Sequence, residues 1–399
     1  MNYLWFGMGV GEKQAEDIVE NGGKILSAAV SQTAILNGLE HSGISFDTIN
    51  VYQVPPYPRY KLKQIPRYTW SHNNRSVDIG IGYTNLKYIS HLSKTKAIKR
   101  EAKAWAKKHK NEKTTIFVYS MHSPLIAGAI KVKKILPEAT VVLIVPDLPQ
   151  FMDLGMSKFK KLLKFFDWQK LKRQIRNVDK YVLYSKHMAE FLNLEEDRCM
   201  VMEGSFDLSS VVHEESKVAS NKISVMYSGV VDMRYGIPEL LKAMDYLDDE
   251  YELWITGGGN AVAFIEEKAK NDERIKYFGF LPSRKELLLK QKSATMLIST
   301  RRPCEEASKY CFPSKLFEYM VSGNPVLSCR IGGIPDEYFD FLTEIQDITP
   351  QYIADAIKKV SSLSEQERDY LGQEGKKYVL EKKNNIYQAK RIMRFLEGA

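Results

Sequence analysis

Short β-rich runs alternate with helical patterns along the chain, and this alternation is the feature that most restricts its fold. The runs of strand length in the first half lie at Tyr3–Phe6, Phe46–Val51, Thr115–Tyr119, Thr140–Val145 and Lys180–Tyr184. Those in the second half lie at Ile223–Ser228, Tyr251–Thr256, Ile275–Gly279, Ala294–Ser299 and Pro325–Ser328. Strands that alternate with helices predict parallel sheets with crossover helices, and thus an α/β protein.

Helical patterns fit between most of these runs. They lie at Ile25–Glu40, Ser93–Lys108, Pro124–Ile135, Lys158–Arg176, Pro238–Leu247, Val262–Lys270, Arg284–Gln291, Ser314–Ser322, Tyr352–Val360 and Asn384–Leu396. The length of 399 residues and the hydrophobic content of 44% suffice for two domains with full cores.

A Ser-rich, weakly periodic stretch at Glu203–Asn221 has the composition of a linker. We therefore expect an N-terminal domain over residues 1–205 and a C-terminal domain over residues 206–380. A final helix within residues 381–399 is expected to pack back on the N-terminal domain.

Positive charge is concentrated in the first half of the chain. Residues 1–190 carry 30 Lys and Arg against 15 Asp and Glu, although the whole chain has a net charge of only +9. The stretch Met156–Asn177 places apolar residues among eight Lys and Arg, a composition typical of a helix that lies on an anionic membrane surface. A basic helix packed on its own domain is the alternative. No nucleic-acid-binding motif accompanies the charge, so we expect no nucleic-acid partner.

The sequence gives few signs of export or of metal binding. No apolar run approaches the ~20 residues that cross a bilayer, and no basic segment precedes the first apolar stretch. We therefore expect a cytoplasmic protein, which would be peripheral on the inner face of the cell membrane if Met156–Asn177 binds that surface. The Cys residues form no CxxC pair, and no His, Asp or Glu set has ligand spacing, so neither a metal site nor a cofactor is expected.

Two glycine-containing segments follow predicted strands in the second half. Gly229 ends the first strand, and Arg234 lies in the loop that follows it. Gly257 and Gly258 follow the next strand, ahead of a helix. Glycine at a strand end lets the backbone approach a ligand closely, and Arg234 supplies a cation for a phosphate.

A third segment follows the strand that ends at Ser299. A polar loop leads to a helix that begins near Ser314, with Lys315 in its first turn and Glu318 one turn further. The helix macrodipole disfavours a cation in the first turn, and an anionic ligand there would resolve this conflict. Glu318 could accept hydrogen bonds from ribose hydroxyls.

The segments FPSKLFEYMVSGNPVL, YSGVVDMRYGIPELLKAM and ITGGG together resemble the donor domain of the family 4, or group 1, retaining glycosyltransferases. This resemblance implies the GT-B architecture, in which two Rossmann-like domains face a central cleft. It also implies a nucleotide-sugar donor, UDP- or GDP-linked, and catalysis without a metal ion.

The resemblance assigns roles to individual residues. Glu318 matches the second glutamate of the family's E-x7-E motif, which contacts the donor ribose, and Tyr310 stands where the first glutamate is usual. Glu305 or Glu306 could substitute for that first glutamate. Val230 and Tyr235 stand where the family commonly has an Arg and a Lys. Arg234 is therefore proposed to supply the missing positive charge. Ser314 and Lys315 are the candidates for phosphate contacts.

In the first half, Asp147 and His122 follow predicted strands and are candidates for orienting or deprotonating the acceptor. The resemblance implies sugar transfer with retention to a saccharide or lipid-linked intermediate of cell-surface polysaccharide synthesis. The alternatives are an inactive GT-B scaffold and a nucleotide-sugar epimerase of similar architecture.

Overall fold

The computed structural model describes residues 1–24, 27–110, 112–151, 158–212, 214, 222–303 and 306–398. The chain divides into two units. Unit 1 comprises Met1–Met202 together with Asn385–Ala399, and unit 2 comprises Glu203–Asn384. The C-terminal segment therefore belongs to the same unit as the N-terminal half.

Unit 1 is built on a mostly parallel sheet with the strand order β10-β9-β8-β7-β1-β2-β5-β4, in which only β4 runs antiparallel to its neighbour. Its strands are β1 (Asn2–Gly7), β2 (Phe46–Asn50), β4 (Tyr68–Trp70), β5 (Asp78–Gly80), β7 (Thr114–Tyr119), β8 (Thr140–Val145), β9 (Lys180–Leu183) and β10 (Cys199–Val201), with a small separate pair of β3 (Gln64–Ile65) and β6 (Tyr83–Thr84). The strands β7 and β8 are almost completely buried, as expected for a parallel sheet covered on both faces.

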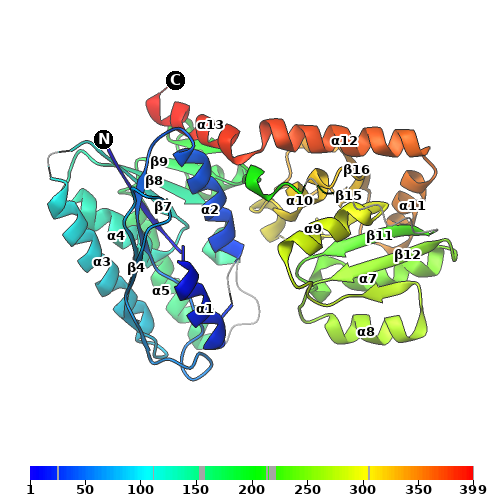
Figure 1. Cartoon of the computed structure of the whole chain (residues 1–399), viewed down its shortest axis with the longest axis horizontal. Coiled ribbons are helices and arrows are strands. Elements are labelled where there is room, and N and C mark those ends of the chain that lie inside the picture. Colours follow the sequence, from blue (N-terminus) through cyan, green and yellow to red (C-terminus); the bar gives the residue numbers. More distant parts are fainter. Residues whose placement is uncertain are drawn as a thin grey trace. The chain divides into compact units, whose positions relative to one another are not determined.

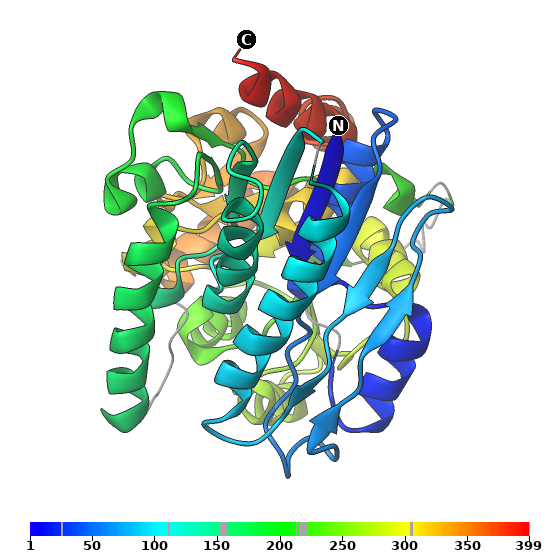
Figure 2. The same cartoon turned by 90° about the vertical axis from the view of Figure 1, so that its left-hand side faces the viewer.

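The helices of unit 1 are α1 (Glu12–Glu20), α2 (Ser27–Glu40), α3 (Ser90–Lys108), α4 (Ser123–Lys133), α5 (Lys158–Ile175), α6 (His187–Leu192) and α13 (Asn385–Glu397). Figure 2 shows α3, α4 and α5 side by side in front of the sheet, and α4 contacts both of the other two. Helix α13 packs on α2. No helix in the described part of the chain is long and apolar enough to cross a membrane.

Unit 2 has a parallel sheet with the strand order β13-β12-β11-β14-β15-β16. Its strands are β11 (Ile223–Ser228), β12 (Tyr251–Thr256), β13 (Ile275–Tyr277), β14 (Met296–Ser299), β15 (Val326–Cys329) and β16 (Leu342–Ile345), and its helices are α7 (Ile237–Ala243), α8 (Val262–Asn271), α9 (Arg284–Ser293), α10 (Lys315–Val321), α11 (Pro350–Ser361) and α12 (Glu365–Lys382) (Figure 1). Numbered along the chain, this is the 3-2-1-4-5-6 order of a Rossmann fold. Such sheets bind ligands where the strand order reverses, which here is between β11 and β14.

The predicted α/β class is confirmed for both units. In unit 2 the strands β11 and β12 have the predicted bounds, because each is an uninterrupted run that the sheet buries completely or almost so. Helix α12 was not predicted. It packs on α10, and a buried ion pair between Lys383 Nζ and Glu203 Oε2, 3.0 Å apart, fixes the chain just beyond its end.

A charged network holds the far edge of the unit 1 sheet. The His72 ring contacts Asp78 on β5 through Nδ1 at 2.8 Å and Glu40 at the end of α2 through Nε2 at 3.0 Å. Burial alone would lower the pKa of His72, but the hydrogen bonds to the two carboxylates outweigh it and raise this pKa to about 9. The protonated imidazole thus joins helix α2 to β5, the strand next to the edge of the sheet.

This network should make stability depend on pH. Because the pKa of His72 is about 9 when folded and about 6.5 when unfolded, its contribution is complete below about pH 6.5 and is lost as pH rises through 9. Urea unfolding should show that His72→Gln costs about 1–2 kcal/mol at pH 6, after allowance for solvent screening, and much less at pH 9.5. The exposed His41, changed to Gln, is the control. An equal cost of His72→Gln at both pH values would contradict the assignment.

Candidate functional site

The carboxyl ends of β11 and β14 lie at the point where the strand order of unit 2 reverses. The strand β11 ends at Ser228 and is followed by Gly229, and β14 ends at Ser299, two residues before Arg301. The two strands are neighbours in the sheet. The residues that follow them are therefore brought to the edge where open α/β sheets bind ligands.

Gly229 and Gly257 let two strand-end loops lie against each other. Both residues have positive φ angles, +123° and +126°, which side chains rarely tolerate. A Cβ added at Gly257 would clash with the carbonyl oxygen of Gly229, and one at Gly258 would meet the ring of Phe280. The amide of Gly229 donates to the carbonyl oxygen of Thr256 at 3.0 Å. These glycines are thus required by the close approach of the loops.

Tyr319 fixes helix α10 against the end of β11. Its buried hydroxyl accepts a hydrogen bond from the Ser228 amide at 2.8 Å and donates to the Ser228 carbonyl oxygen at 2.9 Å. Lys315 precedes Tyr319 by one turn and therefore lies on the same face of the helix. The two hydrogen bonds consequently determine where the Lys315 side chain lies.

Among the described residues, the Lys315 ammonium lies over aromatic rings rather than beside a carboxylate. Its Nζ is 3.9 Å from the ring centroid of Tyr227 and 5.6 Å from that of Tyr319. Its aliphatic chain passes Gly229, where an added Cβ would lie 3.9 Å from the Lys315 Cδ. Burial, together with the positive charge of Arg301, lowers the pKa of Lys315 to about 7. A bound anion would restore its charge.

Arg301 is a second cation at this edge, and the sequence reasoning did not single it out. Its guanidinium carbon lies 5.4 Å from the ring centroid of Tyr235. Its Nε is buried and has no hydrogen-bond partner among the described residues. The neighbouring Arg302 is instead paired with Glu239 at 2.6 Å. The position of Arg301 two residues beyond a strand end was the signal that could have identified it.

Arg234, the predicted phosphate ligand, is held by a carboxylate of its own loop. Its Nε and Nη2 donate to the two oxygens of Asp232 at 2.8 and 2.6 Å. These hydrogen bonds lower the pKa of Asp232 to about 2. Asn260 also donates to Asp232, at 3.2 Å. The charge of Arg234 is therefore partly neutralised, in contrast to that of Lys315.

Glu318 lies on α10 with its carboxylate joined to Arg284, whose Nη2 is 2.9 Å from Oε1. Burial raises the pKa of Glu318, and the opposing charge of Arg284 limits the rise.

The other predicted residues of unit 2 surround the start of α10. Ser314 is exposed directly before the helix, and Tyr310 is half-buried at the end of the preceding loop. Glu306 is exposed, and Glu305 lies outside the described residues. In the described part of the chain, no hydrogen bond or ion pair joins Glu306 to Lys315.

The two acceptor-side candidates lie at the carboxyl edge of the unit 1 sheet. Asp147 is exposed two residues beyond β8, and its charge raises the pKa of the buried Tyr119 hydroxyl, which burial already raises. His122 precedes α4, and its Nδ1 is buried without a partner among the described residues. Burial, aided by the cation Lys94, lowers the pKa of His122 to about 3, so this ring is neutral.

Within the described ranges, no group of His, Cys, Asp and Glu side chains is arranged to hold a metal ion. The positive charge near the glycine loops instead comes from Lys315 and Arg301. Such a pair of cations, together with backbone amides, can bind a diphosphate.

The comparison with protein families finds a match for most of unit 2. Residues 210–378 match the family described as glycosyl transferases group 1. This range contains the glycine loops, Arg301, Lys315 and Glu318. None of the curated protein sequences matches the chain significantly.

Solved structures resemble the chain over its whole length, at low sequence identity. The Anabaena protein HepE, in complex with UDP, has a TM-score of 0.68 at 12% identity, with 100% of both chains covered. Sucrose-phosphate synthase from Thermosynechococcus elongatus has a TM-score of 0.69 at 13% identity, with 100% of this chain and 99% of that chain covered. The lipopolysaccharide outer core galactosyltransferase WaaB has a TM-score of 0.63 at 13% identity, with the same coverage.

These matches agree with the geometry of unit 2, in which a Rossmann sheet presents glycine loops and two cations at its switch point. Residues 210–378 therefore match the glycosyl transferases of group 1, and the chain as a whole has the GT-B fold of the solved structures that it resembles.

Proposed function

We propose that the chain transfers a hexosyl group from a UDP- or GDP-linked sugar to an acceptor, with retention of configuration and without a bound metal ion. The observation that carries this proposal is the Lys315 ammonium, which lies over two tyrosine rings without a carboxylate partner among the described residues. A half-buried cation of this kind is stabilised when a diphosphate binds beside it.

The proposed donor contacts follow from the site geometry. The diphosphate would lie against the Gly229 and Gly257 loops, with Lys315 and Arg301 as its counter-charges. Arg284 bonds Oε1 of Glu318, so that Oε2 can accept hydrogen bonds from the ribose hydroxyls. HepE, which shares the fold, has been solved in complex with UDP-glucose, which supports a nucleotide-sugar donor here.

The protein would act mainly by stabilising charge. As the bond between the anomeric carbon and the phosphate oxygen breaks, negative charge develops on the departing diphosphate. Lys315 and Arg301 are already in place to stabilise it, which lowers the barrier without a metal ion. The acceptor hydroxyl would form its new bond on the same face of the sugar and transfer its proton to the departing phosphate oxygen. No protein carboxylate is required for this proton transfer.

The acceptor would be a saccharide or a lipid-linked intermediate of cell-surface polysaccharide synthesis. The excess of Lys and Arg in residues 1–190 supports an anionic acceptor or membrane surface. WaaB, which shares the fold, is a galactosyltransferase of the lipopolysaccharide outer core. On this proposal Asp147 and His122 orient the acceptor in unit 1.

Donor binding can be tested with UDP-, GDP-, dTDP- and CMP-linked sugars in the presence of EDTA. A ligand at about 100 times its dissociation constant should stabilise the protein by ~2.7 kcal/mol, which is measured as a rise in the unfolding temperature. We expect a rise with a UDP- or GDP-linked sugar that EDTA does not reduce. A rise that required Mg²⁺, or no rise with any of them, would contradict the proposed donor site.

The two arginines of the site should differ in importance. Arg301→Ala should weaken binding of the nucleoside diphosphate by about 10- to 100-fold, because it removes a charge-assisted contact. Arg234→Ala, the matched control, should weaken it by less than about threefold, since this side chain is already paired with Asp232. Titration calorimetry measures both. The reverse order of effects would assign the diphosphate to Arg234.

A further inference from the structure

Unit 1 contains a cavity of about 890 Å³ that the donor site does not use. Its walls come from the loop at residues 56–59, the beginning of α3 and the middle of α5. His91, in its wall, contacts the hydroxyl of Ser123 at the start of α4 at 2.9 Å. The cavity therefore lies near the carboxyl edge of the unit 1 sheet, where such folds bind ligands, and its volume is that of a ligand site.

Large apolar side chains line this cavity and remain open to solvent. Leu92 is 63% exposed, Phe166 61% and Tyr88 59%. Tyr88 also has a φ angle of 70°, a conformation that is costly for a bulky residue. Exposed apolar surface gathered around one hollow indicates a binding site for an apolar group. Strain at its rim is typical of such sites.

Cations surround the same apolar wall. Arg59, Lys87, Lys164 and Lys170 line the cavity. Asp167 also lines it, but its Oδ1 already accepts a hydrogen bond from Ser123 Oγ at 2.6 Å. Arg59 and Lys87 have no carboxylate partner in the described part of the chain. The cavity thus combines apolar walls with two cations, Arg59 and Lys87, that no described carboxylate pairs.

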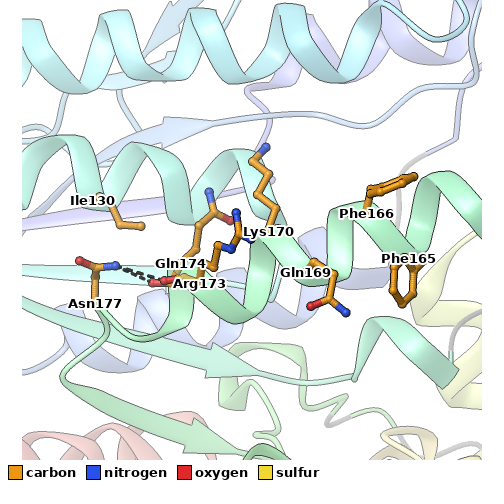
Figure 3. Close-up of a pocket in the computed structure, with 8 residues that line it drawn as sticks. All are labelled: Ile130, Phe165, Phe166, Gln169, Lys170, Arg173, Gln174 and Asn177. Atoms are coloured by element: carbon orange, nitrogen blue, oxygen red, sulfur yellow. Dashed lines mark hydrogen bonds between the residues drawn. The ribbon is translucent and has the colours of Figure 1, made fainter.

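The two sides of α5 differ. Figure 3 shows Phe166 and Lys170 on one side of the helix, whereas Phe165 and Gln169 point to another. Phe166 and Lys170 line the large cavity, and Phe165 and Gln169 do not. Both phenylalanines line a smaller hollow, together with Ile130 of α4, and Phe165 is 54% exposed. Two adjacent phenylalanines of similar exposure are therefore placed differently.

We propose that this cavity binds a lipid that carries a phosphate, with its hydrocarbon chain against Tyr88, Leu92 and Phe166. The phosphate would be held by Arg59 and Lys87. This occupant fits because an uncharged lipid would leave Arg59 and Lys87 without a counter-charge, and a free anion would leave the apolar wall exposed to water. The inference deepens the proposed function and rests on it, because it names the acceptor class: a sugar or hydroxyl carried on a lipid phosphate.

The proposal predicts binding that needs both the chain and the charge. Titration calorimetry of the full chain with farnesyl phosphate should give saturable binding. Farnesol and inorganic phosphate should each bind at least about 100-fold more weakly, because each lacks one of the two contacts. Arg59→Ala combined with Lys87→Ala should weaken binding of farnesyl phosphate by about tenfold or more and leave that of farnesol unchanged.

Neighbouring substitutions separate the cavity from general adsorption to α5. Phe166→Asp and Leu92→Asp should each weaken binding of farnesyl phosphate by about tenfold or more, because a carboxylate would enter the apolar wall. Phe165→Asp, the matched control on the same helix, should change it by less than about twofold. The side chains of Leu92, Phe165 and Phe166 are all exposed. The unfolding temperature of each variant should therefore stay close to that of the unaltered chain. Equal losses with Phe165→Asp and Phe166→Asp would overturn the proposal, as would equal binding of farnesol and farnesyl phosphate.

UDP binding, measured on the same samples, distinguishes failure of the two proposals. UDP binding without farnesyl phosphate binding would overturn the lipid site and leave the donor site intact. Farnesyl phosphate binding that follows the pattern above, without binding of any nucleotide, would support the lipid site and contradict the proposed donor.

Discussion

The position of the Lys315 ammonium over the ring of Tyr227 is the interaction on which the account of unit 2 depends. A charged ammonium that is partly withdrawn from water is unfavourable unless an anion or a π-system compensates it. The two tyrosine rings compensate part of this cost, and the pKa of about 7 indicates that the remainder is large. The site is therefore arranged for an anion that it does not itself supply.

The rest of unit 2 keeps this lysine in place. The hydroxyl of Tyr319 clamps α10 to the end of β11, and Gln291 adds a hydrogen bond to Ser228 Oγ at 2.9 Å. The glycines at 229 and 257 keep the adjacent loops free of side chains, so that backbone amides can approach a ligand. The switch point then brings Arg301 to the same edge. Binding in this region depends on backbone geometry as much as on charged side chains.

Much of this arrangement could be predicted from the sequence. The strands β8, β11 and β12 are runs of strand length that the sheet buries almost completely, and their bounds were predicted without error. The short strands between residues 64 and 84 were missed because two- or three-residue strands in a polar stretch carry no periodicity. Helix α12 was missed because its mostly polar sequence lacks a clear apolar stripe.

The site was predicted less completely. The conflict between Lys315 and the helix dipole pointed to an anion, but the tyrosine rings around it come from segments about 90 residues apart. The pairing of Arg234 with Asp232 is a matter of side-chain conformation, which sequence spacing does not determine. Arg301 was missed because the cations of the family motif are expected at positions 230 and 235. Likewise, the apolar residues of Met156–Asn177 do not share one environment: Leu171 is buried, whereas Leu162 and Phe166 are exposed.

The most direct test of the account is the proton uptake that accompanies binding of UDP. Calorimetry at pH 8 in two buffers of different ionisation enthalpy measures it. Since the pKa of Lys315 is about 7, this amine is mostly neutral at pH 8, and binding of a diphosphate should take up about one proton. The Lys315→Met variant should bind UDP more weakly and without this proton uptake. The control is Lys290→Met, which removes another lysine packed on aromatic rings. It should bind UDP with the same affinity and proton uptake as the unaltered chain. Binding of UDP without proton uptake, or with the same uptake in Lys315→Met, would contradict the central role of Lys315.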